Sequence, residues 1–167
     1  MKRLLEILFI FICFLLQSTL LRHVSFAGIV PNLMIIITSI FGFMEGRTDG
    51  MCVGFACGLL TDIFYGSVLG LNALIYLIIG YLNGVGNRGF YPDDIKLPLI
   101  FISGSDMVYL LLTYISGFLL RARLDIGYYF IHLMLPELVY TVAVSLIVYI
   151  PIRNLFLRFD RGAEEED

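Results

Sequence analysis

Three acidic residues, Asp62, Asp106 and Glu137, fall inside long apolar stretches of the sequence. An ionisable side chain at the centre of a membrane helix costs about 2.5–3.5 kcal/mol, so such groups usually face other helices or a hydrated cavity. They could relay protons, bind an ion or solute, contact a partner, or act as polar clamps between helices. For Asp62 the functional and structural interpretations are evenly balanced. For Asp106, which follows the small residues 103–105, a clamp is favoured.

His132, Pro136 and Glu137 lie in one apolar stretch and, with Asp106, give a candidate intramembrane polar cluster of Asp106, His132 and Glu137. A helical proline lacks the N–H that would bond the carbonyl four residues back, so Pro136 should free the His132 carbonyl and kink the helix. His132 and Glu137 are five residues apart, about 140° round a helix, and need not share a face. Glu137 is better placed to touch Tyr140, three residues on.

No pattern in the sequence points to catalysis or to a metal. It contains no H-E-x-x-H, no G-x-S-x-G and no glycine-rich phosphate loop, and no nucleophile stands beside an evident base. The three cysteines, Cys13, Cys52 and Cys57, lie in apolar stretches without C-x-x-C spacing, which is typical of packing residues. We therefore expect a protein that is not an enzyme and that has no cofactor, no metal and no nucleic-acid partner.

The composition places these residues in a membrane. Apolar residue types make up 59% of the 167 residues and charged residues 15%, against about 25% charged in soluble chains. The mean hydropathy of +0.92 leaves little polar surface to face water. This composition excludes a soluble enzyme, a disordered linker and a secreted disulfide scaffold. The sequence predicts an all-α integral membrane protein.

Apolar stretches between charges predict six spans in a compact bundle. They cover about residues 4–21, 29–44, 50–64, 69–83, 97–120 and 126–150. Pro31 suits the first turn of the second span, and the sixth should stop at Pro151. These spans form one domain, residues 1–160, followed by a short acidic tail, residues 161–167.

Spans two to four are short for a bilayer, which needs about 20 residues per helix. The pair 50–64 and 69–83 has a tight turn, so a re-entrant hairpin that does not cross fully is the alternative to two crossings.

The distribution of basic residues predicts the orientation. With six spans, one side of the membrane carries Lys2, Arg3, Arg47, Arg88, Lys96, Arg153, Arg158 and Arg161. The other side carries Arg22, Arg121 and Arg123. Because basic residues are enriched in cytoplasmic segments, both termini are predicted to be cytoplasmic.

Glycines recur every four residues across the second and third spans, at Gly42, Gly46, Gly50, Gly54 and Gly58. In the third span they put a strip of small residues on one helix face, which lets helix backbones approach closely in lipid. Packing within the chain is favoured over packing against a partner's single span. We expect the continuation of this spacing across the loop at residues 45–49 to be coincidental.

Three segments form a recognisable pattern: Pro31–Leu33, Gly54–Ile63 and Gly70–Leu74, the last leading into Tyr76 and Gly80–Leu82. The G-x-x-x-G-L-x-x-D pattern followed closely by G-x-N-A-L is distinctive. Together these segments resemble the MreD family of rod shape-determining membrane proteins of bacteria. The fifth and sixth spans match only in hydropathy, and the acidic tail is not part of the pattern.

The resemblance implies a non-enzymatic scaffold in the bacterial cell membrane. Its expected partners are an MreC-like single-span protein, the glycosyltransferase and transpeptidase of the elongation complex and, indirectly, MreB filaments. The family is also similar in fold to the substrate-binding components of energy-coupling factor transporters. A vitamin-transport component is therefore the alternative, with Asp106, His132 and Glu137 lining a polar solute cavity, although similarity of fold alone does not establish transport.

The residues expected to matter most lie in and around the turn between spans three and four: Gly54, Gly58, Asp62, Gly70 and Asn72. We expect the glycines to permit close helix contact, and Asp62 with Asn72 to shape the turn.

Overall fold

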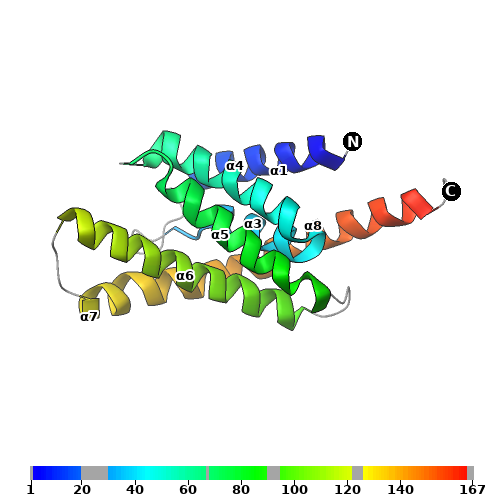
Figure 1. The fold of residues 1–167 in the computed structure, drawn as a ribbon. Helices are drawn as coiled ribbons and strands as arrows, with labels where there is room; N and C mark the ends of the chain where they lie inside the picture. Colours follow the sequence, from blue (N-terminus) through cyan, green and yellow to red (C-terminus); the bar gives the residue numbers. More distant parts are fainter. Residues whose placement is uncertain (1, 20–29, 67, 90–94, 122–125, 165–167) are drawn as a thin grey trace.

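The chain folds as an all-helical bundle, which confirms the predicted all-α class (Figure 1). The computed structural model describes residues 2–19, 30–66, 68–89, 95–121 and 126–164, and it has helices and turns but no strand in these ranges. The helices are α1 (Lys2–Ser18), α3 (Leu33–Glu45), α4 (Arg47–Tyr65), α5 (Leu71–Val85), the 3-10 helix η1 (Gly86–Gly89), α6 (Lys96–Arg121), α7 (Ile126–Tyr129), the π-helical segment η2 (Phe130–Met134) and α8 (Leu135–Glu164). Helices α7, η2 and α8 follow one another without a break.

Helix α3 is the central helix of the bundle. Every residue from Leu33 to Met44 is buried, and the helix contacts α1, α4, α5, α6 and α8. Its sequence is apolar on all sides, as expected of a helix surrounded by protein. With 13 residues it is about 20 Å long, shorter than the hydrocarbon core of roughly 30 Å.

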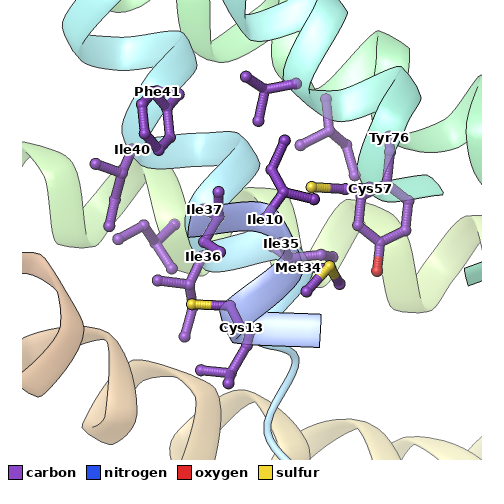
Figure 2. Packing of buried hydrophobic residues seen from close by; sticks show 14 of the residues in the cluster. Ile10, Cys13, Met34, Ile35, Ile36, Ile37, Ile40, Phe41, Cys57 and Tyr76 are labelled. Carbon is purple, nitrogen blue, oxygen red and sulfur yellow. The ribbon is translucent and has the colours of Figure 1, made fainter. Parts of the chain in front are cut away.

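A single hydrophobic cluster surrounds α3 (Figure 2). Helix α1 contributes Ile10 and Cys13, and Cys57 of α4 and Tyr76 of α5 enter from other sides. Cys13 and Cys57 are buried free thiols, as expected of packing residues, whereas Cys52 is exposed on α4.

Two predicted helix boundaries at prolines are wrong. Pro31 lies outside α3, and Asn32 caps the helix instead, because its side-chain oxygen accepts a hydrogen bond from the Ile35 backbone N–H. Pro151 lies inside α8, which continues to Glu164. Tyr149 and Ile152, on either side of Pro151, are 1% and 4% exposed. Their packing outweighs the intrinsic cost of about 3 kcal/mol for a proline inside a helix.

Two helical stretches are long and apolar enough to cross a membrane, Lys96–Gly117 in α6 and Gly127–Asn154 in α7 to α8. Shorter apolar stretches are Ile7–Ser18, Leu33–Glu45 and Leu71–Val85. In Figure 1 the start of α1 and the end of α8 lie at the same end of the bundle.

Candidate functional site

The Asp62 carboxylate holds the turn between α4 and α5. Asp62 is 2% exposed, and its two oxygens accept four hydrogen bonds. Oδ2 accepts from the backbone N–H groups of Gly70 and Ala73, both at 2.9 Å. Oδ1 accepts from the Asn72 backbone N–H at 3.1 Å and from Asn72 Nδ2 at 2.9 Å. Asp62 and Asn72 therefore do meet at this turn.

These hydrogen bonds make Asp62 the N-terminal cap of α5, supplied by the preceding helix. The capping position itself is Gly70, which has no side chain and whose φ of 96° lies in the left-handed region that favours glycine. The first N–H groups of a helix have no partner within the helix, and a negative charge is favourable beside them. Because both Asp62 oxygens are occupied, this carboxylate is engaged inside the chain and does not face outward to a partner.

The glycine strip of α4 packs directly against α5. A Cβ atom added at Gly58 would lie 2.5 Å from both the Ala73 Cα and the Asn72 carbonyl oxygen, and one at Gly54 would collide with the Tyr76 carbonyl. Side chains cannot fit at these separations, so both positions require glycine. The strip is covered by the chain itself, in agreement with the internal packing favoured from the sequence.

Helix α5 carries a matching strip of small residues that was not predicted from the sequence. Gly80 faces the Gly50 carbonyl, and Gly84 faces the backbone of Arg47. The signal was available, because Gly80 and Gly84 are four residues apart on one helix and repeat the spacing of α4. Together the two strips bring α4 and α5 into close contact along their length.

The glycine spacing across residues 45–49 is not coincidental, contrary to our expectation. A Cβ atom at Gly42 would lie 2.8 Å from the Gly80 carbonyl oxygen, and one at Gly50 would lie 2.6 Å from the Gly42 Cα. The physical reason is the connection between α3 and α4, which is the single residue Gly46 with φ 98°. The two helices therefore meet immediately after the turn, and α3, α4 and α5 converge at three glycines.

Asn32 is a polar junction whose contacts were not foreseen from the sequence. Its Oδ1 accepts hydrogen bonds from the Ile35 backbone N–H at 3.2 Å and from the Tyr76 hydroxyl at 3.0 Å. Its backbone N–H donates to Thr141 Oγ1 at 3.3 Å. Asn32 thus connects α3 with α5 and α8, and Tyr76 packs edge-on against Tyr109 of α6 with ring centroids 5.3 Å apart.

Replacing Asn32 by alanine should lower the stability of the bundle measurably. The variant loses an N-cap, worth about 0.5–2 kcal/mol, and removes the Asn32 acceptor of the buried Tyr76 hydroxyl, where a lost hydrogen bond costs about 0.5–1.5 kcal/mol. Thermal unfolding of the purified protein in detergent measures the change. Tyr76→Phe is the matched control, because it removes the hydroxyl together with its need for a partner and should lower the melting temperature less. Equal melting temperatures for Asn32→Ala and the unsubstituted protein would contradict this role.

Asp106 and Glu137 lie near each other between α6 and α8. Asp106 is completely buried, and neither carboxylate oxygen has a hydrogen-bond partner of ordinary geometry. The hydroxyl group of Thr141, on α8, lies beside the Asp106 carboxylate. Glu137 is half-buried and lies close enough to Asp106 and Tyr109 to interact with them electrostatically. This arrangement fits a polar contact between two long helices.

His132 has different surroundings from these two acids. It is exposed, its ring stacks on Tyr128 with centroids 4.3 Å apart, and its Nδ1 lies 3.3 Å from the Tyr128 carbonyl oxygen. The described contacts therefore bring together two members of the candidate cluster and not the third. Among the described residues, no group of three or more His, Cys, Asp or Glu side chains could hold a metal ion.

The irregularity expected at Pro136 takes the form of the π-helical segment η2. The Leu135 backbone N–H donates to the Phe130 carbonyl, five residues back, immediately before the proline. This wider π-helical turn precedes Pro136, which has no backbone N–H to donate to a carbonyl of the preceding turn.

The fold and these residues define a bundle of apolar helices in which buried polar groups cap helices and connect them. A family model described as rod shape-determining protein MreD matches residues 1–159. The chain therefore belongs to the MreD family, whose members are membrane proteins of the machinery that determines rod shape. Comparisons with curated proteins and with solved structures gave no significant match.

Proposed function

We propose that this protein is a multi-pass scaffold of the bacterial elongation complex. It binds an MreC-like single-span protein and helps couple MreB filaments to the glycosyltransferase and transpeptidase that build the lateral peptidoglycan. The observation that carries this proposal is the family match, which extends over residues 1–159 and so includes nearly all of the helical bundle.

The arrangement of the bundle supports a scaffold. Two of the buried polar side chains, Asp62 and Asn32, cap helices, and the hydrogen bonds of Asp62 remain inside the chain. The outer helix faces carry large exposed apolar residues, including Ile147 at 73% and Ile100 at 66%. Such faces suit contact with lipid and with other transmembrane helices.

The proposed topology has six crossings, with both termini in the cytoplasm. The start of α1 and the end of α8 lie at the same end of the bundle (Figure 1), as an even number of crossings requires. The excess of basic residues on that side supports a cytoplasmic location for both termini.

Affinity purification from the native host in a mild detergent, with partners identified by mass spectrometry, tests the proposal. We expect an MreC-like single-span protein together with enzymes of wall synthesis. Recovery of paired ATPases with a large membrane coupling subunit would contradict the scaffold and support a transport component instead. That second function is favoured by one observation, the completely buried Asp106 carboxylate, which has the Thr141 hydroxyl as its neighbour and would then be a candidate ligand group.

A further inference from the structure

Asp106 of α6 is a carboxylic acid in the interior of the bundle. It is completely buried, and the Thr141 hydroxyl of α8 lies beside its carboxylate. The Thr141 oxygen also accepts the Asn32 backbone N–H at 3.3 Å, and a hydroxyl has a single proton to donate. An ionised Asp106 could therefore receive at most one hydrogen bond from Thr141, although a carboxylate has about four acceptor positions.

Asp62 provides the comparison within the same bundle. It is equally buried, but its two oxygens accept four hydrogen bonds from N–H groups at the start of α5, where a negative charge is favourable. Asp106 lies in the middle of α6, away from any helix N-terminus, and its oxygens have no hydrogen-bond partner of ordinary geometry. A buried carboxyl group without such donors becomes neutral rather than staying charged. Its surroundings therefore favour the protonated form of Asp106.

Glu137 of α8 is the second acid at this contact. It is half-buried and interacts electrostatically with Asp106. The other titratable groups that interact with the two acids are tyrosines: Tyr76 of α5, Tyr109 of α6 and Tyr129 of α7. Residues 33–44 of α3, which also packs against α6, include no titratable side chain. Among the described residues no basic side chain acts on either acid, so nothing there compensates two negative charges.

We propose that Asp106 and Glu137 form a proton-binding site inside the bundle. Asp106 holds the proton, and the partly exposed Glu137 is the group through which it exchanges. On release, the proton passes from the Asp106 carboxyl to the Glu137 carboxylate and from there to water. The bound proton leaves at most one negative charge between α6 and α8, and its loss places two like charges there, which repel. The contact between α6 and α8 is therefore tighter with the proton bound.

Infrared spectroscopy of the protein in lipid nanodiscs detects this proton, because protonated carboxylic acids and carboxylates absorb at different frequencies. We expect a protonated-acid band at neutral pH that Asp106→Asn removes. This variant should fold, since asparagine matches the size of the protonated acid and can also donate a hydrogen bond. Asp49→Asn is the control and should keep the band, because Asp49 is partly exposed in the first turn of α4.

Glu137→Gln tests whether the two acids act as a pair. Glutamine carries no charge that opposes ionisation of Asp106. The protonated-acid band should therefore be lost at a lower pH in Glu137→Gln than in the unsubstituted protein.

Thermal unfolding as a function of pH tests the effect on helix packing. A folded protein that holds a proton released by the unfolded chain becomes less stable as the pH rises. From mildly acidic to mildly alkaline pH, the melting temperature should therefore fall more steeply for the unsubstituted protein than for Asp106→Asn, which has no proton to lose at this position.

Each measurement can contradict the proton site. A protonated-acid band that is unchanged in Asp106→Asn would overturn it, because Asp106 would then be ionised. Loss of the band at the same pH in Glu137→Gln and in the unsubstituted protein would overturn the pairing of the two acids. Parallel melting profiles for Asp106→Asn and the unsubstituted protein would overturn the link to the α6–α8 contact. The scaffold function is tested separately, by the recovery of its partners.

Discussion

Replacing Asp62 by alanine is expected to destabilise the α4–α5 hairpin by several kcal/mol. The substitution removes four hydrogen bonds at once and leaves the backbone N–H groups of Gly70, Asn72 and Ala73 without their acceptor. Each buried donor left unpaired costs about 1–3 kcal/mol. The favourable charge at the N-terminus of α5 is lost as well. Thermal unfolding in detergent and the amount of protein in membranes should both fall.

Asp62→Asn separates the charge from the shape. An asparagine offers one acceptor oxygen and places an amide donor against the N–H groups. We therefore expect the stability of Asp62→Asn to lie between that of Asp62→Ala and that of the unsubstituted protein. Thr61→Val is the control in the same turn of α4, because the Thr61 hydroxyl donates to the Cys57 carbonyl of its own helix and not across the turn to any described residue of α5. Full stability and cell-shape activity of Asp62→Asn would show that the charge is not needed. Full stability of Asp62→Ala would contradict the capping role.

Replacing Gly58 by alanine is the second change with a large expected effect. The added methyl group would lie 2.5 Å from the backbone of α5 at Asn72 and Ala73. Backbone atoms cannot turn away as a flexible side chain can, so the two helices must separate. Overpacking of a core costs about 1–3 kcal/mol even when side chains adjust, and we expect at least that loss. Gly58→Leu should be worse.

The control for Gly58→Ala is Gly104→Ala, where the new methyl group has no atom within 4 Å. Alanine is the better helix former by about 0.8–1.0 kcal/mol, so this variant should be neutral or slightly more stable. Circular dichroism during heating gives the melting temperatures of both variants. If the two variants melted at the same temperature, α4 and α5 would not be packed as closely as described.

The turn between α4 and α5 could be predicted from the sequence because its determinants are local. Gly54, Gly58 and Asp62 repeat every four residues on one helix face, and Gly70 and Asn72 follow within ten residues. Such short-range spacing identifies the positions that must be small. The particular hydrogen bonds that Asp62 accepts, including the one from the Ala73 backbone N–H, required the structure.

Contacts between distant segments could not be predicted in this way. Asn32 bonds to Tyr76, 44 residues away, and to Thr141, 109 residues away, and nothing in the local pattern around Asn32 indicates either partner. The position of His132 depends on η2, since a π-helical turn changes the angle between successive side chains. Pro151 is a helix-ending signal that tertiary packing overrides.

The pattern of new wall synthesis after depletion of the protein from its native host tests the scaffold most directly. Cells fed a fluorescent D-amino acid should lose labelling along the side wall and become round. Re-expression of the unsubstituted protein should restore the pattern, and Gly58→Ala should not. Side-wall labelling and rod shape that persist after complete depletion would contradict the account.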